Sequence, residues 1–487
     1  MSIFITTAHT LGNVDRKIYS GFVEHMGRCV YGGIVPSTYP KESSQDRCDE
    51  NNFRVDVMEA VKDLAPPLVR YPGGNYTAQF NWMDGVGPER KAKVDLAWHN
   101  VEANTFGTNE FMTWCKAADV EPFLCLNMGT GDLREALAWV EYCNVEKGSY
   151  YADLRRSHGV EKPYKVKNWC LGNEIWGDWQ VAQQTKEDYA KNAIQWAKAI
   201  KLLDPEIKLV LCGCTGIVDW DRYVLAECIE WVDYHSIHFY SACANYNETV
   251  FSPLVAEKAI QITESLIDLA RVTKGVEKKV KIAFDEWNVW DQINIKGSEG
   301  CEQHYCCADM LAVGTWLNIF IRQASIVEIA CIAQTVNVIS PLLTKDGDLV
   351  KQTIYWPLYL FSKYMKGRSI SVHVECDEWD GELKAAMTKY PKGMQKLKWI
   401  DSSATVDDEN YLTIAMVNKK KESTTVTFNL DRASPKGQVE KFEVSGKPDD
   451  VNTFENKEMV ALKKEKMDWA PKVGLKPCSI TMLRWKM

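Results

Sequence analysis

Eight short apolar runs alternate with longer segments of helical periodicity between residues 18 and 365, and this alternation constrains the fold more than any other feature. Each run ends in polar or glycine-rich residues, as buried strands of repeated βα units do. The runs are Phe22–Tyr31, Leu68–Tyr71, Pro122–Asn127, Val166–Glu174, Ile207–Cys212, Val232–Tyr240, Val280–Glu286 and Ile326–Gln334. The amphipathic segments between them include Arg54–Leu64, Thr108–Ala118, Leu133–Cys143, Lys186–Leu203, Ser265–Lys274 and Ala308–Phe320. Eight strands interleaved with helices predict an α/β fold of the (β/α)8 TIM barrel type.

A doubly wound parallel sheet also alternates strands with helices. That fold would place a glycine-rich phosphate-binding loop after its first strand. The corresponding segment, Gly27–Gly33, has the sequence GRCVYGG and does not match that fingerprint. The barrel is therefore the preferred architecture.

After about residue 367 the pattern changes to a period of two. Tyr411–Asn418, Ser423–Leu430 and Cys478–Trp485 alternate apolar and polar residues as half-buried antiparallel strands do. The opening Ser2–Ala8 reads as a further strand of the same kind. We therefore expect a catalytic barrel over residues 17–366, and a jelly-roll-like β-sandwich formed by residues 1–16 together with residues 367–487.

Polar residues gather at the ends of the predicted strands, where the active site of a TIM barrel lies. They are Glu24, His25, Arg70, Asn127, Asn173, Glu174, His238, Tyr240, Glu286 and Gln334. Glu174 and Glu286 each follow an apolar run and precede tryptophan. Such a pair suits glycoside hydrolysis, in which one carboxyl group protonates the leaving oxygen and another attacks the sugar. Taken singly, Glu174 also fits an exposed loop, and Glu286 also fits a structural ion pair.

Charge, hydropathy and cysteine spacing exclude several classes of binding partner and ligand. A net charge of -8 and a pI near 5.7 argue against nucleic acid. No apolar stretch approaches the roughly 20 residues of a membrane helix, and the first ten residues lack the features of a secretion signal. The sixteen cysteines contain no CxxC pair, so we expect free thiols, no zinc site and a cytoplasmic location.

The segment Asp233–His238 offers residues of metal-ligand type. Alternation along a strand places Asp233 and His235 on one face and His238 on the other, which opposes a shared metal. No motif for a cofactor appears either. We therefore expect neither a metal nor a cofactor, with His238 as a hydrogen-bonding wall residue.

Several stretches resemble glycoside hydrolase family 51 α-L-arabinofuranosidases of the intracellular, exo-acting type: Gly21–Gly33, Arg70–Asn75, Asn81–Pro88 and Asn104–Gly107, in addition to the two glutamate motifs. The resemblance implies that Glu174, after the fourth strand, is the acid/base, and that Glu286, ending the seventh, is the nucleophile. It further implies retention of configuration, with carboxyl groups roughly 5 to 5.5 Å apart, and a homo-oligomer, commonly a hexamer. The residues it assigns to sugar binding are Glu24, Asn75, Asn173, Tyr240 and Gln334.

Three further residues complete the predicted site. Trp98 and Trp290 are expected to line the sugar pocket, and Arg70 is expected to brace the carboxylates by charge pairing. The expected substrates are terminal α-L-arabinofuranosyl units of arabinan or arabinoxylan fragments. An endo-acting β-glucanase or xylanase of the same clan, and a catalytically silent carbohydrate-binding protein, remain as alternatives. Linkage preference stays open, because the loops at residues 241–250 and 296–301 match no motif.

Overall fold

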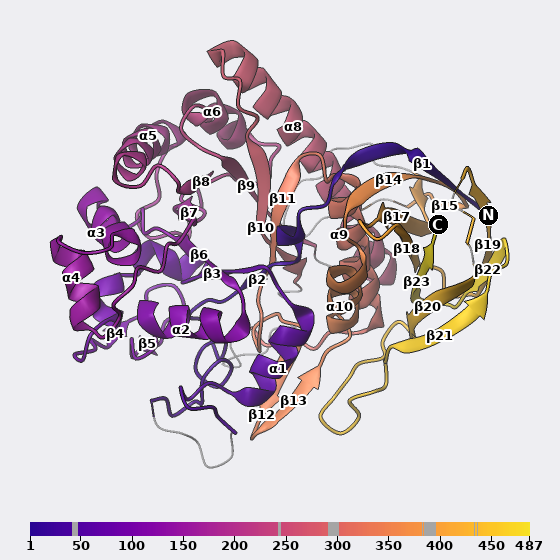
Figure 1. The fold of residues 1–487 in the computed structure, drawn as a ribbon, viewed down its shortest axis with the longest axis horizontal. Coiled ribbons are helices and arrows are strands. Elements are labelled where there is room, and N and C mark those ends of the chain that lie inside the picture. The colour runs from indigo at the N-terminus through magenta and orange to yellow at the C-terminus, as the bar shows by residue number, and fades with distance from the viewer. Residues whose placement is uncertain are drawn as a thin grey trace.

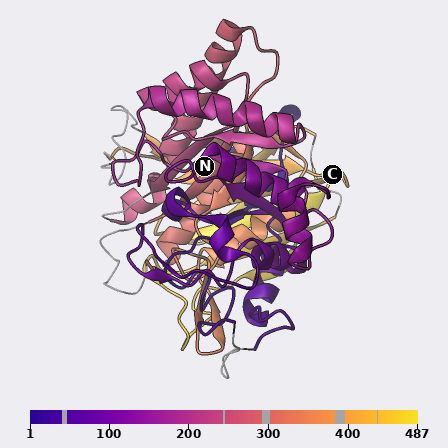
Figure 2. The same cartoon turned by 90° about the vertical axis from the view of Figure 1, so that its left-hand side faces the viewer.

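The computed structural model describes residues 1–40, 47–241, 245–290, 301–381, 383, 396–432, 434–435 and 437–487. A barrel and a smaller β-domain lie side by side, and both chain termini are in the β-domain (Figure 1). Figure 2 views the molecule from the barrel side, with the β-domain behind it. Among the described residues, no helix has the length and apolar character needed to cross a membrane.

Eight parallel strands form the barrel, and all eight fall on the predicted runs. In the order of the sheet, the strands are β11 (Val327–Ile332), β10 (Lys281–Val289), β9 (Tyr234–Ser241), β8 (Lys208–Leu211), β7 (Asn168–Leu171), β6 (Glu121–Cys125), β3 (Leu68–Tyr71) and β2 (Gly21–Phe22). The first and last strands meet, because Ser20 forms a parallel bridge with Cys331. The predicted TIM barrel is confirmed.

Ten helices of the described chain accompany the strands. They are α1 (Val55–Leu64), α2 (Thr108–Ala118), α3 (Leu133–Asn144), α4 (Tyr150–Ser157), α5 (Lys186–Leu203), α6 (Asp219–Cys228), α7 (Tyr246–Phe251), α8 (Leu254–Lys274), α9 (Cys307–Arg322) and α10 (Tyr355–Tyr364). In α5 the buried residues Tyr189, Ala193, Trp196 and Ile200 recur every three or four positions and face the sheet. This spacing is why the sequence pattern located the helix correctly.

Two element boundaries differ from the prediction by more than a few residues. The first strand ends at Phe22 rather than continuing to Tyr31, because the chain leaves the ladder and turns through Gly27 at φ 51°. Helix α8 begins at Leu254, eleven residues before the predicted start at Ser265. The buried positions Val255, Ala259 and Ile260 extend its apolar face toward the N-terminus.

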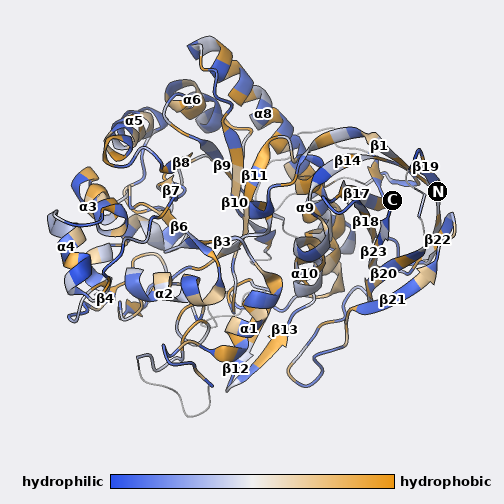
Figure 3. Ribbon diagram, in the orientation of Figure 1, coloured by the Kyte–Doolittle hydropathy of each residue, from blue (hydrophilic) through white to orange (hydrophobic). Residues whose placement is uncertain are grey.

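The β-domain is a nine-stranded sheet that curls around its own apolar core, so that its two halves face each other (Figure 1). Its order is β21 (Lys463–Asp468), β20 (Gln438–Ser445), β23 (Ser479–Lys486), β18 (Tyr411–Asn418), β17 (Ile400–Val406), β14 (Arg368–Glu375), β1 (Ser2–Asn13), β19 (Thr424–Leu430) and β22 (Lys472–Leu475). The edge strand β21 is mostly hydrophilic, whereas barrel strand β11 is mostly hydrophobic (Figure 3). The predicted C-terminal β-domain is confirmed.

The N-terminal strand β1 pairs with β14 and β19, so residues far apart in sequence build one sheet. This pairing supports our proposal that residues 1–16 and 367–487 form one domain and residues 17–366 another. Helix α9 packs between the barrel and this sheet. A side chain at Gly314 would bring its Cβ within 2.6 Å of Ile480, so a glycine permits the close approach.

The remaining short elements lie in connections. They are the 3-10 helices η1 (Arg16–Tyr19), η2 (Asn75–Gln79) and η3 (Trp82–Gly85), and the strand pairs β4 (Lys93–Val94) with β5 (Val101–Glu102), β12 (Leu342–Lys345) with β13 (Asp348–Lys351), and β15 (Glu378–Trp379) with β16 (Leu397–Lys398). The cysteines that the structure describes are all free, as predicted. Part of the two loops left without a role, residues 242–244 and 296–300, lies outside the described residues.

Candidate active site

A cavity of about 590 Å³ opens at the carboxyl ends of the barrel strands. It brings together nine of the eleven predicted site residues: Glu24, Asn75, Trp98, Glu174, His238, Tyr240, Glu286, Trp290 and Gln334. The other two, Arg70 and Asn173, are buried next to these residues and contact each other, since Arg70 Nη2 donates to Asn173 Oδ1 over 2.6 Å. Two predicted strand-end residues belong elsewhere. His25 binds Glu102 and Tyr71, and Asn127 binds Phe80 and Thr130.

Glu174 reaches the cavity through a sharp turn after β7. The strand stops at Leu171 because Gly172 adopts φ 81°, a region that favours glycine, and Glu174 itself has φ 46°. A non-glycine residue in the left-handed region is strained, and such strain is often found at functional positions. The turn thus directs the Glu174 carboxyl group into the cavity instead of along the strand.

Glu286 lies on β10 and is held by two donors. Tyr240 donates its hydroxyl hydrogen to Oε1 over 2.7 Å, and Arg70 Nη1 donates to Oε2 over 2.9 Å. Simple alternation predicts that Phe284 and Glu286 share a face, and this prediction is wrong. The register of β10 against β9 shifts between Ala283 and Glu286, so a bulge turns Glu286 inward while Phe284 packs on Trp316 of α9.

Strand β9 supplies a donor to each of three carboxyl groups. Its alternate residues Ser236, His238 and Tyr240 face the barrel interior. Ser236 Oγ donates to Asp285 Oδ1 over 2.5 Å, Nδ1 of His238 lies 3.0 Å from Glu174 Oε1, and Tyr240 binds Glu286. One strand face therefore organises the acidic groups delivered by its neighbours.

The two predicted catalytic carboxylates lie close together. Each of Glu174, His238 and Glu286 offers one atom to a group whose members are all within 4.8 Å of one another. Retaining glycosidases hold their carboxyl groups about 5 to 5.5 Å apart, whereas inverting enzymes leave about 6.5 to 9.5 Å for a water molecule. The short separation fits direct attack on the sugar by one carboxylate.

Burial and neighbouring charges shift the pKa values of Glu174 and of the adjacent His238. Burial raises the pKa of Glu174 above the ordinary 4.5, and the Glu286 carboxylate acts in the same direction, against hydrogen bonding from His238. Burial also opposes charge on His238, but Glu286 and Asp285 outweigh it and raise the pKa of His238 to about 10. Glu174 is thus favoured as an acid, next to a cationic imidazolium.

Glu24 and Gln334 form a second polar wall. Gln334 Nε2 donates to Glu24 Oε2 over 3.1 Å, and Trp98 Nε1 donates to Glu24 Oε1 over 3.1 Å. Burial raises the pKa of Glu24 to about 7, although the backbone N–H of Tyr76 opposes this shift. A Cβ at Gly74 would lie 3.3 Å from both the Glu24 and Glu286 carboxylates, so the glycine keeps the space between them clear.

One buried amide group at this site has unused hydrogen-bonding capacity. Asn173 Nδ2 is buried and has no hydrogen-bond partner among the described residues. Asn75 accepts a hydrogen bond from Gln180 Nε2 over 2.9 Å, and the same nitrogen also binds the Asn173 carbonyl. Gln180 therefore links the two asparagines. A sugar hydroxyl would satisfy the buried amide of Asn173.

Aromatic side chains complete the lining. Trp290 packs edge-on against Tyr240 with ring centroids 5.1 Å apart, and Trp176 packs edge-on against Trp179 at 5.2 Å. Trp179 is 55% exposed at the mouth of the cavity. Flat apolar faces beside hydrogen-bonding groups suit a ligand that has both C–H and hydroxyl surfaces.

The arrangement also bears on metal binding. Asp233, His235 and His238 do not converge, because Asp233 pairs with lysines and His235 with Asp221. Glu174, His238 and Glu286 are near enough to one another to ligate an ion. However, the guanidinium of Arg70 and the imidazolium of His238 already face these carboxylates and supply the positive charge that a metal would bring.

We therefore expect incubation with EDTA to leave the initial hydrolysis rate unchanged. The physical reason is that proton donation and nucleophilic attack by two carboxyl groups need no Lewis acid. The measurement is the rate before and after chelation, with a buffer-only control. Activity that is lost on chelation and restored by one divalent cation would instead identify a metal centre at these three residues.

Among the residues that sequence reasoning missed, Asp285 and Gln180 make hydrogen bonds or ion pairs with the predicted site residues. Asp285 is 1% exposed and forms an ion pair with Arg70 Nε at 3.3 Å. Its position directly before Glu286 was a signal, but alternation places consecutive residues on opposite faces, and only the bulge brings both inward. Gln180 lies in a loop after β7, where no periodic pattern marks it.

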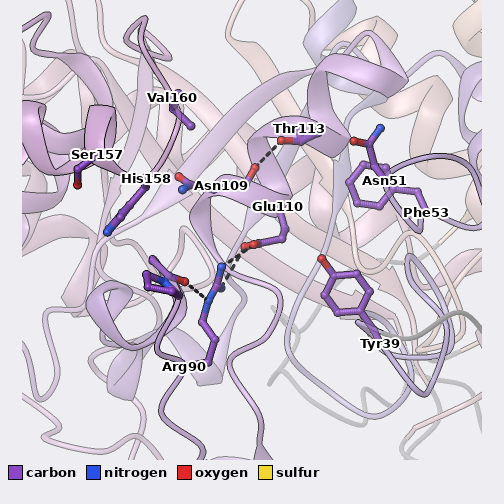
Figure 4. Close-up of a pocket in the computed structure, with 12 residues that line it drawn as sticks. Tyr39, Asn51, Phe53, Arg90, Asn109, Glu110, Thr113, Ser157, His158 and Val160 are labelled. Atoms are coloured by element: carbon purple, nitrogen blue, oxygen red, sulfur yellow. Dashed lines mark hydrogen bonds and ion pairs between the residues drawn. The ribbon is translucent and has the colours of Figure 1, made fainter.

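A second cavity, of about 550 Å³, lies on the flank of the barrel between α2, the end of α4 and two loops (Figure 4). Its charged residues neutralise each other, since Arg90 Nη2 donates to Glu110 Oε1 over 2.6 Å. Asn109 is held by the hydroxyls of Tyr142 and Tyr164. Its described lining has no pair of facing carboxyl groups, so the hydrolytic chemistry belongs to the cavity at the strand ends.

Comparisons with known proteins agree with this geometry. Two family models match the chain: the α-L-arabinofuranosidase 1 domain over residues 60–252 and the α-L-arabinofuranosidase C-terminal domain over residues 285–479. The chain is 48% identical to α-L-arabinofuranosidase C of Emericella nidulans, with 98% of this chain and 95% of that protein covered.

A bacterial relative and a solved structure extend the comparison. The chain is 36% identical to the intracellular exo-α-(1→5)-L-arabinofuranosidase 1 of Bacillus subtilis, with 88% of this chain and 86% of that protein covered. It superimposes on a thermostable family 51 α-L-arabinofuranosidase from Thermotoga petrophila with a TM-score of 0.91 and 33% identity, covering all of both chains.

Proposed function

This chain belongs to glycoside hydrolase family 51 and is a retaining α-L-arabinofuranosidase, and from that premise we propose that Glu286 is its nucleophile and Glu174 its acid/base. The observation that supports this most directly is the pair of carboxyl groups within 4.8 Å. Their surroundings differ in the sense that the two roles require. Glu286 accepts hydrogen bonds from Arg70 and Tyr240, which stabilise an anion, whereas burial raises the pKa of Glu174 and so favours its protonated form.

In the first step a carboxylate oxygen of Glu286 attacks the anomeric carbon of the arabinofuranosyl unit. The bond from that carbon to the glycosidic oxygen breaks, and Glu174 gives its proton to the departing oxygen. The product is an ester between Glu286 and the sugar. Arg70 and Tyr240 hold the attacking carboxylate so that one oxygen faces the substrate.

In the second step Glu174, now ionised, takes a proton from water. The water oxygen forms a bond to the anomeric carbon, and the bond to Glu286 breaks. Glu286 is released as a carboxylate and Glu174 is again protonated, so the enzyme returns to its starting state. Two inversions give net retention.

The remaining residues are proposed to hold the sugar. Glu24 and Gln334 accept and donate hydrogen bonds at one wall, and the unpartnered amide of Asn173 suits the 2-hydroxyl. Asn75, Tyr240 and His238 border the same space, and Trp98 and Trp290 cover it. Arg70 acts on the carboxylates and not on the sugar.

The proposed substrates are oligosaccharides with terminal α-L-arabinofuranosyl units, hydrolysed from the non-reducing end in the cytoplasm. The name of the Bacillus subtilis relative, which is intracellular and exo-acting, supports this proposal. The family resemblance also implies a homo-oligomer, commonly a hexamer, which sedimentation of the purified protein would test. The endo-glucanase, xylanase and silent-binding alternatives have no support from the comparisons.

The deciding experiment compares initial rates on 4-nitrophenyl α-L-arabinofuranoside, β-D-xyloside and β-D-cellobioside. We expect strong preference for the arabinofuranoside, because the cavity offers polar walls for one furanose ring. Chain-length dependence on linear arabino-oligosaccharides should then give arabinose as the first product. Preference for the cellobioside, or products released from mid-chain, would contradict the proposal.

A further inference from the structure

Asp285 has a position that the two-carboxylate mechanism does not use. It does not line the cavity, yet it contacts four groups beneath it. Arg70 Nε lies 3.3 Å from Oδ2, His238 Nε2 lies 3.4 Å from Oδ1, Ser236 donates over 2.5 Å, and Cys170 Sγ donates over 3.3 Å. Burial raises the pKa of Asp285, but Arg70 and His238 more than compensate and hold it below the ordinary value. Asp285 is therefore a buried anion with two cations beside it.

Among the ionisable groups that contact Arg70 or His238 directly, namely Glu174, Asp285 and Glu286, the resting charges balance only when Asp285 is counted. Arg70 and His238 are cations and Asp285 is an anion, while Glu286 is the proposed carboxylate nucleophile and burial favours the protonated form of Glu174. Without Asp285 two cations would face a single carboxylate. Glu174 would then be drawn toward ionisation, because nearby positive charge favours the charged form of a carboxyl group.

The same balance applies after the first chemical step. Esterification removes the negative charge of Glu286, and proton donation creates one on Glu174. Nδ1 of His238 lies 3.0 Å from Glu174 Oε1 and 3.5 Å from Glu286 Oε2. One N–H group thus faces both positions of the moving charge, while the other ring nitrogen faces Asp285.

We infer that Asp285 is a positioning residue of the reaction: its fixed negative charge keeps His238 and Arg70 cationic. The three carboxyl groups that face these cations, Asp285, Glu286 and Glu174, then carry two negative charges throughout, one of which moves from Glu286 to Glu174 and back. This inference rests on the proposed roles of the two glutamates. It assigns Asp285 no contact with substrate. It explains why an aspartate buried beneath the cavity directly precedes the nucleophile.

The groups that face this network come from several strands. Titratable side chains from the barrel strands or the loops after them lie near Asp285 and Glu174. They are Glu24 after β2, Arg70 on β3, Cys125 on β6, Cys170 on β7, Cys212 and Cys214 after β8, His238 and Tyr240 on β9, Glu286 on β10, and Cys331 on β11. Burial raises the pKa of Cys170, Cys212, Cys214 and Cys331, so these thiols stay neutral. The cations of the network are Arg70 and His238.

The test is the pH dependence of kcat/KM for Asp285→Asn. Removing a negative charge makes the site release a proton at lower pH, whether the proton leaves Glu174 or His238. We therefore expect the basic limb to move down by about one pH unit or more, together with a lower kcat. His238→Gln removes a positive charge and should move the same limb upward.

If the basic limb moves in opposite directions in Asp285→Asn and His238→Gln, the cause is the change of charge, because general damage to the fold would not give shifts of opposite sign. A matched control is Asp233→Asn. Like Asp285, Asp233 is a barrel aspartate that forms ion pairs, in its case with lysines. It directly precedes β9, at the opposite end of that strand from His238. Asp233→Asn should leave the basic limb in place even if it lowers the unfolding temperature. If Asp285→Asn does not fold, an unmoved or lowered basic limb in His238→Gln overturns the inference, because the inference requires a positive charge on His238.

Two results would overturn the inference: an unmoved basic limb in a folded, active Asp285→Asn variant, or shifts of the same sign in Asp285→Asn and His238→Gln. Failure of the proposed function would look different. In that case the parent protein itself would not hydrolyse arabinofuranosides, or would show no basic limb that depends on Glu174.

Discussion

Replacing Glu286 by alanine is expected to lower kcat on 4-nitrophenyl α-L-arabinofuranoside by about 10⁵-fold, an increase in activation free energy of about 7 kcal/mol. The loss is large because the variant has no group to form the glycosyl ester, whereas Glu174, Arg70 and His238 remain. Fold should be retained, since Arg70 keeps its ion pair with Asp285 at 3.3 Å and its bond to Asn173.

Azide gives this prediction a stereochemical test. A small anion can enter the space left by the Glu286 carboxyl group and attack the anomeric carbon once. We expect partial recovery of the rate and a β-configured arabinofuranosyl azide, because a single displacement inverts the α-linked substrate. Glu277→Ala, which alters an exposed glutamate just before β10, is the control and should keep parental activity. Full activity in Glu286→Ala would refute the assignment of the nucleophile.

Replacing Glu174 by alanine is expected to slow hydrolysis by about 10² to 10⁴-fold, the usual contribution of a general acid/base. The loss should depend on the leaving group. A nitrophenolate departs without protonation, so ester formation persists and a burst of nitrophenol should precede slow turnover. An arabino-oligosaccharide needs the proton and should lose more.

Two measurements, the pH profile and the configuration of the azide product, distinguish the role of Glu174 from that of Glu286. Burial raises the pKa of Glu174, so the parental basic limb, where the acid loses its proton, should lie above the ordinary range of glutamate. This limb should disappear in Glu174→Ala. Azide should attack the ester formed by Glu286 and give the α-configured azide. A persistent basic limb, or a β-azide, would contradict the assignment of the acid/base.

The sequence pattern predicted where the two glutamates lie relative to β7 and β10, but not which face of β10 Glu286 occupies. Both glutamates were located from an apolar run followed by a polar end, because hydrophobic burial imposes that pattern on each strand separately. The prediction that Phe284 and Glu286 share a strand face was wrong, since the bulge in β10 arises from pairing with β9. Alternation is a property of one chain segment, whereas a register shift requires two.

The sequence predicted only some of the charged contacts around the two glutamates. Arg70 was expected to brace the carboxylates, and in the structure it donates a hydrogen bond to Glu286 and forms an ion pair with Asp285. Asp285 itself was not anticipated, and neither was the bridging position of His238 between Glu174 and Glu286. These contacts join residues from β3, the β7 loop, β9 and β10, which are separated by tens to hundreds of positions in sequence.

The sequence alone determined the barrel, the added β-domain and the two acidic strand ends, because periodic burial and local motifs are written within single segments. The tertiary structure sets the hydrogen-bond and ion-pair partners of each carboxyl group and the distance between the two groups. Those properties depend on distances and desolvation, and these exist only after the strands have closed into a barrel and brought distant residues to one rim.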